Sequence, residues 1–152
     1  MRQVSGHWRA IILDYTIKTN ELTAVEFIRL FIAAGWTPPC EEQVNAALSG
    51  SMAVFSVSVQ GESVAMARVV GDGAMTFLIK DVVVAPAYQG YGLGRLLVSL
   101  LEDYIQKQLK PGWAASAELM SAEGKEGFYE KCGYRKCTDK GLGSGMMKMI
   151  RR

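Results

Sequence analysis

Residues 82–105, VVVAPAYQGYGLGRLLVSLLEDYI, join an apolar run to three alternating glycines and a long amphipathic segment. The run Val82–Val84 predicts the end of a strand, because Pro86 cannot continue a central strand. From Leu93 to Ile105 apolar residues recur at helical spacing and form one continuous face. We therefore expect a strand, a glycine turn and a long helix that Pro111-Gly112 ends.

Working outward, three β-rich segments with short turns between them precede this stretch, which predicts antiparallel pairing. A helix starting at Thr23 has capping-box spacing to Glu26. Beyond the long helix, the pattern predicts further strands and one short helix. The other expected elements are strands at Ala10–Ile17, Ala53–Val59, Ser63–Val70, Met75–Val84, Ala114–Met120, Arg135–Cys137 and Met146–Ile150, and helices at Glu41–Leu48 and Glu123–Lys131.

The length and composition suit one soluble domain. The chain of 152 residues can bury one substantial core, so we expect a single domain over residues 1–152. A net charge of +2 is too small to imply general attraction to nucleic acid or to an anionic membrane. No apolar stretch is long enough for a membrane span, and the N-terminus lacks a signal-peptide segment. These features predict a cytoplasmic protein without nucleic-acid or membrane partners.

The cysteines and the histidine argue against several kinds of site. Cys40, Cys132 and Cys137 are odd in number, which disfavours a disulfide framework. With His7 as the only histidine, a zinc site and a Ser-His-Asp or Cys-His mechanism are both disfavoured. We therefore expect free thiols and no bound metal.

The turn Gln89–Arg95 has no cluster of reactive side chains, so its chemistry must come from the backbone. Free N–H groups and the dipole at a helix start favour a phosphate or pyrophosphate, and glycines allow its close approach. The spacing G-x-G-x-G is not the dinucleotide G-x-G-x-x-G, and the Gly-Lys-Ser/Thr of a Walker loop is absent. On local evidence alone, a glycine turn without a ligand is the alternative.

The segment Gln89–Gly94 matches the Q/R-x-x-G-x-G/A motif, and here the sequence resembles the GNAT superfamily of acetyl-CoA-dependent N-acetyltransferases. A second segment, FYEKCGY at Phe128–Tyr134, is similar to the usual FYxKxGF. The resemblance covers the chain from about Ala53 to its end, and the N-terminal third only by its strand–helix–helix pattern. It implies an α+β fold with a mostly antiparallel, splayed sheet of about six or seven strands and about four helices on its faces.

The resemblance also implies a role for each matching position. Amides of the glycine turn should bind the pyrophosphate of coenzyme A, and the strand before it should pair with the pantetheine arm. Tyr129 aligns with the tyrosine that often protonates the departing thiolate, and its phenol has a reference pKa of about 10. Aromatic packing is the alternative for Tyr129. The residues implied to bind acetyl-CoA are Val82, Val83, Val84, Gln89, Gly90, Tyr91, Gly92, Leu93, Gly94 and Arg95.

The sequence offers three candidates for the general base. Asp81 lies in an otherwise apolar strand, where a charge is costly unless it is paired or faces a cleft. It is expected either to act on the acceptor amine or to be a structural partner. Arg68 could pair with it or with Asp72, or bind an acidic acceptor. Glu118 is a second candidate, and a water chain to solvent is a third.

Two positions depart from the family pattern. Ala122 stands where many members have an asparagine that touches the cofactor, which puts that contact in doubt. Lys80 stands where some relatives that acetylate polyamines have a glutamate, and a cation there would repel such a substrate. An apolar wall for the acceptor could come from Trp36, Phe31 and Tyr15, although such residues are more often core.

We therefore expect an enzyme, an acetyl-CoA-dependent N-acetyltransferase that acts on a small primary amine by direct attack in a ternary complex. The alternatives are a protein or peptide acceptor, and a non-catalytic module that binds acyl-CoA. The resemblance also points to a homodimer, since GNAT proteins are often dimers, without identifying the interface.

Overall fold

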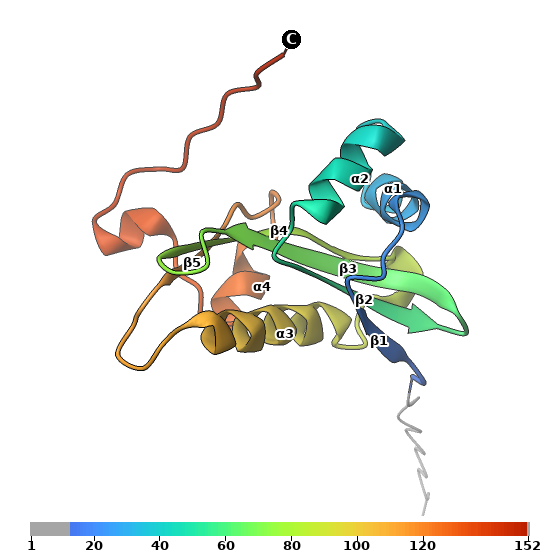
Figure 1. The fold of residues 1–152 in the computed structure, drawn as a ribbon, viewed down its shortest axis with the longest axis horizontal. Coiled ribbons are helices and arrows are strands. Elements are labelled where there is room, and N and C mark those ends of the chain that lie inside the picture. Colours follow the sequence, from blue (N-terminus) through green and yellow to red (C-terminus); the bar gives the residue numbers. More distant parts are fainter. Residues whose placement is uncertain (1–12, 152) are drawn as a thin grey trace, which may run out of the picture.

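The computed structural model describes residues 13–151 and is built around one five-stranded sheet in the order β1-β2-β3-β4-β5 (Figure 1). Helices α1 and α2 cover one face of the sheet and α3 covers the other. The strands are β1 (Thr16–Thr19), β2 (Ala53–Val59), β3 (Glu62–Gly71), β4 (Thr76–Val84) and β5 (Ser116–Leu119). The helices are α1 (Ala24–Ala33), α2 (Glu41–Ser49), α3 (Leu93–Gln108) and α4 (Glu126–Lys131), with 3-10 turns η1 (Pro86–Tyr88) and η2 (Cys137–Lys140).

The first four strands pair antiparallel, and β5 joins β4 in parallel. Short turns suffice between antiparallel neighbours, whereas the parallel pair needs a crossover, which α3 supplies. This crossover places the start of α3 directly after the end of β4. The sequence pattern of strand, glycine turn and helix is therefore confirmed as one connected unit.

Two apolar layers hold the sheet between its helices. On one face, Leu97 and Leu101 of α3 are fully buried against β2, β3 and β4. On the other face, Phe27 and Leu30 of α1 pack with Val83 of β4. Every residue of β2 is buried, as expected for a strand covered on both faces. Each fully buried leucine contributes roughly 2 kcal/mol of hydrophobic stabilisation.

The fold class is confirmed, but the expected number of strands is wrong. The described chain has five strands, because Arg135–Cys137 and Met146–Ile150 form none. A strand needs a neighbour for its main-chain groups, and the chain after α4 turns into η2 and then runs away from the sheet (Figure 1). The predicted strand Ala10–Ile17 lies partly outside the described residues, and β1 begins at Thr16.

Helix boundaries agree with the sequence to within a few residues. The short helix α4 begins at Glu126 rather than Glu123, since Gly124 at φ +78° belongs to the preceding turn. Within residues 13–151, no helix has both the length and the apolar character that crossing a membrane requires.

The predicted capping box at the start of α1 is present. The Thr23 hydroxyl accepts from the Glu26 amide at 3.2 Å, and Glu26 Oε2 accepts from the Thr23 amide at 2.9 Å. We expect Thr23→Ala to lower the free energy of unfolding by about 1 kcal/mol, measured by urea denaturation. The N-cap of α2, Cys40, makes no side-chain cap bond, so Cys40→Ala is the matched control and should change stability by less than about 0.5 kcal/mol. Equal losses in the two variants would contradict the cap.

Candidate functional site

The glycine turn presents its main chain to solvent. Gly90 and Gly92 have φ of +85° and +82°, and nothing lies within 4 Å of the position that a Cβ would take at either residue. The main-chain hydrogen bonds of α3 begin with the amide of Leu96, which donates to the Gly92 carbonyl at 3.0 Å. The amides of Leu93, Gly94 and Arg95 precede it and have no intrahelical acceptor. The turn therefore fits a pyrophosphate group, which requires open space and unpaired donors.

The third glycine of the motif has a different role. A Cβ at Gly94 would lie 3.2 Å from a ring carbon of Phe128 and 3.8 Å from Cγ2 of Val84. The lack of a side chain thus lets α4 pack closely on the start of α3. Gly94 connects the two sequence motifs in space, a contact that sequence reasoning missed because the motifs are more than 30 residues apart.

The Arg95 side chain also contacts α4. Its Nη1 donates to the Lys131 carbonyl at 3.4 Å, at the end of α4. Its side chain therefore contacts a helix C-terminus, where a cation is favoured. Gln89, at the other end of the turn, donates from Nε2 to the Val84 carbonyl at 3.1 Å and ties the turn to β4.

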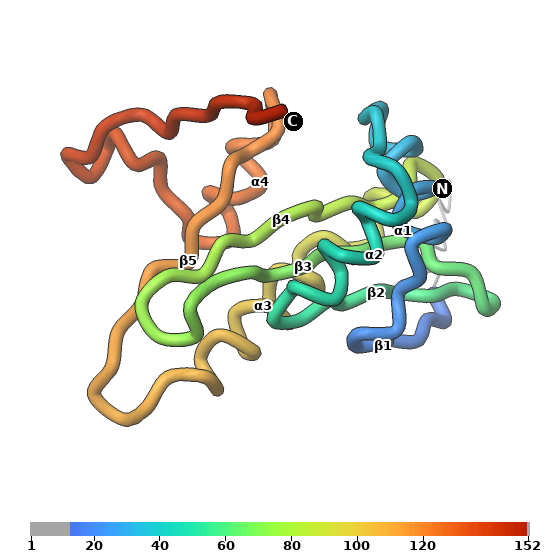
Figure 2. The backbone as a smooth tube through the Cα atoms, turned by 45° about the horizontal axis from the view of Figure 1, so that its top comes forward, coloured from blue at the N-terminus to red at the C-terminus, as the bar shows by residue number. Residues whose placement is uncertain are grey.

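A gap opens between β4 and β5. The two strands pair only from Thr76 to Ile79 on β4, so Lys80–Val84 have no strand neighbour on that side among residues 13–151. Figure 2 shows β4 continuing toward the glycine turn while the chain after β5 leaves it for α4. A free strand edge can pair through its main chain with an extended ligand. Val82–Val84 lie on this free edge, and their pairing with the pantetheine arm stays a prediction.

The gap begins at a bulge in β4. Lys80 pairs with Arg68 and Val83 pairs with Met66, so Asp81 and Val82 together face one residue of β3. Asp81 has φ +53°, an uncommon value for a non-glycine residue. Bulges redirect side chains and often occur beside active sites. No sequence signal beyond the lone acid in an apolar strand marked this bulge.

The bulge places Asp81 against Arg68. Arg68 Nε donates to Asp81 Oδ2 at 2.5 Å, and both side chains are largely buried, 16% and 11% exposed. Arg68 Nη1 also donates to the Ser51 hydroxyl at 3.2 Å. Of the partners weighed for Arg68, the structure selects Asp81. Asp72 instead accepts from the amides of its own turn, which lower the pKa of its carboxyl.

Breaking this ion pair should destabilise the fold. We expect Asp81→Asn to lower the free energy of unfolding by about 2–3 kcal/mol, because it leaves the Arg68 guanidinium largely buried without a countercharge. Urea denaturation measures the change. Glu62→Gln is the matched control: Glu62 pairs with Arg29 at 2.6 Å in an exposed position, so its loss should be below about 1 kcal/mol. A smaller effect at Asp81 than at Glu62 would contradict the pairing.

Tyr129 lies on α4, on the α3 side of the sheet (Figure 1). Its ring packs edge-on against Phe128 at 4.9 Å and Tyr134 at 6.1 Å between centroids. Burial raises the pKa of the Tyr129 hydroxyl, and the neighbouring Cys132 thiol adds to this effect. The hydroxyl therefore keeps its proton over the whole neutral range. Asp81 faces the opposite side, with Phe27 of α1 nearby, so the two predicted catalytic residues flank the sheet from different faces.

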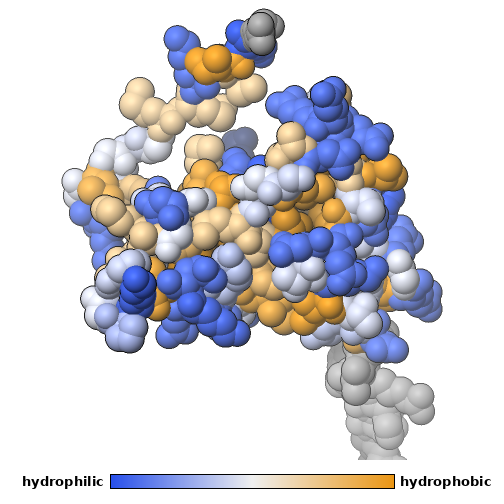
Figure 3. Space-filling model, in the orientation of Figure 1, coloured by the Kyte–Doolittle hydropathy of each residue, from blue (hydrophilic) through white to orange (hydrophobic). Residues whose placement is uncertain are grey.

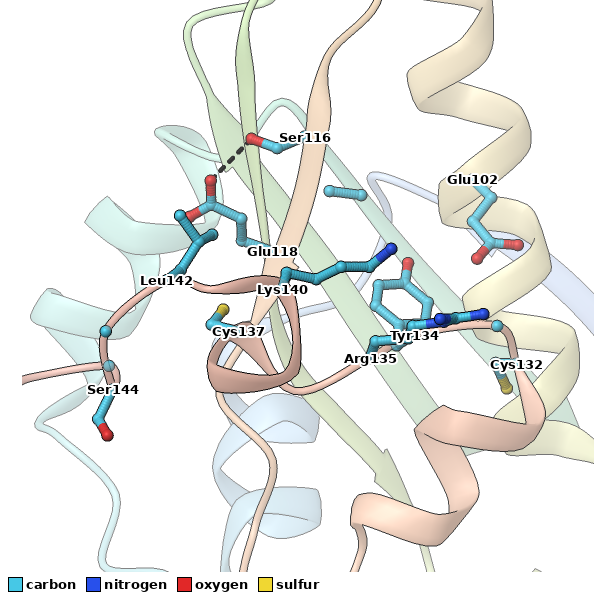
Figure 4. Close-up of a pocket in the computed structure, with 14 residues that line it drawn as sticks. Glu102, Ser116, Glu118, Cys132, Tyr134, Arg135, Cys137, Lys140, Leu142 and Ser144 are labelled. Carbon is cyan, nitrogen blue, oxygen red and sulfur yellow. Dashed lines mark hydrogen bonds between the residues drawn. The ribbon is translucent and has the colours of Figure 1, made fainter.

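A cavity of about 680 Å³ lies between β5, α3 and the chain that follows α4. Figure 4 shows Tyr134 and Lys140 pointing into this space, with Glu102 reaching toward it from α3. The Tyr134 hydroxyl is buried without a hydrogen-bond partner among the described residues. Burial raises the pKa of Tyr134, and the Glu102 charge raises it further. This cavity was not expected from the sequence, because β strands were predicted there.

The structure also places the other candidate residues named from the sequence. Glu118 is exposed on β5 and accepts from the Ser116 hydroxyl at 2.7 Å. Phe31 packs edge-on against Trp36 at 5.0 Å, so these two aromatic residues do form one cluster, at the end of α1. Tyr15 precedes β1 and belongs to neither apolar layer. Among residues 13–151 no group of three or more histidine, cysteine or acidic side chains could hold a metal ion.

Comparisons with known proteins agree on one family. The model of the acetyltransferase (GNAT) domain matches residues 50–136. The chain is 29% identical over 129 residues to an uncharacterized N-acetyltransferase, ycf52, of Porphyra purpurea, covering 82% of this chain and 72% of that protein. It is 32% identical over 109 residues to the chloroplastic serotonin N-acetyltransferase 2 of rice, covering 69% of this chain and 52% of that protein.

Solved structures show the same fold. A GNAT-family acetyltransferase of Streptococcus pneumoniae superposes with a TM-score of 0.76 at 26% identity, covering 91% of this chain and all of that one. Glucosamine-6-phosphate N-acetyltransferase of Arabidopsis thaliana shares the fold with a TM-score of 0.60 at 20% identity, covering 90% of this chain and 98% of that one.

Proposed function

This chain belongs to the GNAT family of acetyl-CoA-dependent N-acetyltransferases, and on that premise we propose that it transfers the acetyl group to the primary amine of a small molecule. The acceptor attacks directly while both substrates are bound. The observation that carries the proposal is the open main chain of the glycine turn next to the unpaired edge of β4. A phosphate-bearing, extended ligand fits both features at once.

Binding is mainly a main-chain function. The amides from Gly90 to Arg95 hold the pyrophosphate of coenzyme A, favoured by the positive end of the α3 dipole. Val82–Val84 pair with the pantetheine arm along the side of β4 that β5 leaves free. The cofactor supplies an acetyl group activated as a thioester. Together these contacts direct that group into the gap between the two strands.

Two side chains transfer protons in this proposal. The Tyr129 hydroxyl, protonated and half-buried, gives its proton to the departing thiolate. Asp81 contacts the acceptor amine from the α1 side and accepts its proton, directly or through water. Arg68 acts as a positioning residue, because its bond to Oδ2 holds the carboxylate in one orientation.

The small acceptor is supported by two observations. The first is that the rice relative is named a serotonin N-acetyltransferase. Phe31 and Trp36 form an aromatic cluster at the end of α1, on the same face as Asp81. Such a cluster suits an aromatic or apolar amine better than a strongly charged one.

The test measures release of the coenzyme A thiol from acetyl-CoA against a panel of aryl, alkyl and polyamine acceptors, with peptides as a second set. Acetylation of small amines, lowered in Asp81→Asn, would support the proposal. Activity only with peptides would show that the acceptor is a peptide or protein amine and not a small molecule. Tight acetyl-CoA binding without thiol release in any panel would make the chain a non-catalytic acyl-CoA-binding module and overturn the enzymatic assignment for these acceptors.

The compartment is part of the proposal. The composition favours the cytoplasm, whereas relatives in rice and Arabidopsis are named as chloroplastic. We retain the cytoplasmic prediction for this chain, and a fluorescent fusion observed in the source cells tests it.

A further inference from the structure

Hydrogen bonds join the end of α2 to Asp81. The hydroxyl of Ser51, just beyond the last residue of α2, donates to the Ala47 carbonyl at 2.7 Å. Arg68 Nη1 donates to the same hydroxyl at 3.2 Å, and Arg68 Nε donates to Asp81 Oδ2. The path therefore runs from α2 and the turn after it, through β3, to the bulge of β4.

The chemistry of these groups fixes the direction of each bond. A serine hydroxyl has one proton and two acceptor lone pairs, whereas a guanidinium has only donors. Because the Ser51 proton bonds to the Ala47 carbonyl, a lone pair of its oxygen faces Arg68. Ser51 is half-buried and the Arg68 side chain is 16% exposed, so water has little access to replace this bond.

Arg68 needs this second contact to hold Asp81 in one orientation. A single bond from Nε to Oδ2 leaves the guanidinium plane free to turn about that bond, and the bond from Nη1 to Ser51 fixes the plane. Asp81 lies in the bulge of β4 at φ +53°, where the regular pairing with β3 is interrupted. The direction of its carboxylate thus depends on its side-chain partner.

The helix at the other end of this path has few further contacts with the sheet. α2 packs mainly against α1, and Val44 is the one residue of Glu41–Ser49 that is fully buried. Figure 3 shows mainly hydrophilic residues where α2 stands above the sheet in Figure 1. The bond between Ser51 and Arg68 therefore ties the end of α2 to the sheet, beside the carboxylate that the proposed reaction uses.

We propose that Ser51 is a positioning residue for acetyl transfer. Through Arg68 it fixes the Asp81 carboxylate toward the acceptor amine, so that the end of α2 sets the geometry of the attack. This inference rests on the role proposed for Asp81. A reacting group that is misplaced by about 1 Å loses up to roughly a hundredfold in rate, so a distant hydroxyl that orients it affects turnover.

The first test does not need turnover. Nuclear magnetic resonance of the ¹⁵N-labelled chain follows the exchange of the Arg68 Nε–H proton with water. In Ser51→Ala this exchange should become about tenfold faster, because the guanidinium loses its second anchor and opens more often. Ser51→Thr keeps the hydroxyl and should exchange within about twofold of the unmodified chain. An unchanged exchange rate in the alanine variant would overturn the inference.

The second test measures kinetics. Ser51→Ala should lower kcat for a small amine about tenfold, while the dissociation constant for acetyl-CoA stays within about twofold. The two differ because the variant alters neither the glycine turn nor the edge of β4. Ser51→Thr should restore kcat to within about twofold of the unmodified chain. A threonine variant as slow as the alanine variant, although its Arg68 exchange is normal, would contradict the role of the hydroxyl.

Ser63→Ala is the matched control. Ser63 is buried at the other end of β3, and its hydroxyl donates to Glu26 Oε1 at 2.8 Å. The two alanine variants should lower the urea midpoint of unfolding by similar amounts, because each loses one hydroxyl bond. Only Ser51→Ala should lower kcat. An equal fall of kcat in both variants would indicate general loosening of the fold and overturn the positioning role.

A double-mutant cycle shows whether Ser51 acts through Asp81. In a folded Asp81→Asn chain, Ser51→Ala should lower the residual kcat by less than about twofold, because the group that it positions is already lost. A tenfold fall in both backgrounds would place the effect elsewhere. If the unmodified chain released no thiol with any acceptor, the proposed function would fail, whereas the exchange of the Arg68 proton would still decide whether Ser51 holds Arg68.

Discussion

Tyr129→Phe should lower kcat about a hundredfold while the dissociation constant for acetyl-CoA stays within about twofold. The substitution removes only the hydroxyl, so the ring still packs against Phe128 and Tyr134. The departing thiolate then lacks its proton donor, and solvent must replace it. Steady-state thiol release and titration calorimetry measure the two quantities separately.

The pH profile adds a second readout for Tyr129. Burial raises the pKa of its hydroxyl above the ordinary value of 10.0, so an acid of this kind keeps its proton longer as pH rises. Any alkaline fall in kcat from loss of this proton should therefore lie above pH 10, and a fall near neutral pH would have to come from another group. The Phe variant should lack that alkaline limb.

Tyr134→Phe is the matched control. It removes a hydroxyl from the neighbouring ring, and that hydroxyl is buried, close to Glu102, in the lining of the cavity between β5 and α3. We expect kcat within about a factor of two of the unmodified chain. If Tyr134→Phe abolished turnover and Tyr129→Phe did not, the proton donor would be Tyr134 and the role proposed for Tyr129 would be wrong.

Gly92→Val should weaken acetyl-CoA binding at least about tenfold and destabilise the fold by about 1–2 kcal/mol. Gly92 is the N-cap of α3 and has φ +82°, a conformation that a β-branched residue adopts only under strain. The open space beside it would also receive two methyl groups, at the point where we propose that the pyrophosphate approaches the amides. Calorimetry with acetyl-CoA and thermal unfolding measure the two effects.

Gly112→Val separates strain from lost binding. Gly112 has φ +84° in the turn after α3, and it likewise has nothing within 4 Å of the position that a Cβ would take. The variant should lose a similar amount of stability but bind acetyl-CoA normally. If Gly92→Val bound acetyl-CoA as tightly as Gly112→Val, the glycine turn would not be the pyrophosphate site.

Much of the site was predictable because its parts are local in sequence. The glycine turn, the strand before it and the helix after it form one continuous stretch, and their identities follow from residue spacing alone. The capping box of α1 is local in the same sense, since it joins residues three positions apart. Tyr129 was found through its motif, although nothing local showed which side of the sheet it would occupy.

Contacts between distant segments came only from the folded chain. The sequence allowed Arg68 to pair with Asp81 or Asp72 or to bind an acidic acceptor. In the structure Arg68 pairs with Asp81, which lies in the bulge of β4. The packing of Phe128 on Gly94 depends likewise on where α4 meets α3. No local pattern encodes a meeting of this kind, because it depends on how separate elements are placed by the common core.

Local pattern therefore determined the helices, the first five strands and the glycine turn of this protein, since hydrogen bonding within a helix or a turn joins residues a few positions apart. Tertiary structure decided the bulge, the β4–β5 gap and the lack of a strand after η2 in the described chain. Residues Met146–Ile150 alternate as a strand does, yet they form none, because a strand exists only where a neighbour accepts its main-chain bonds.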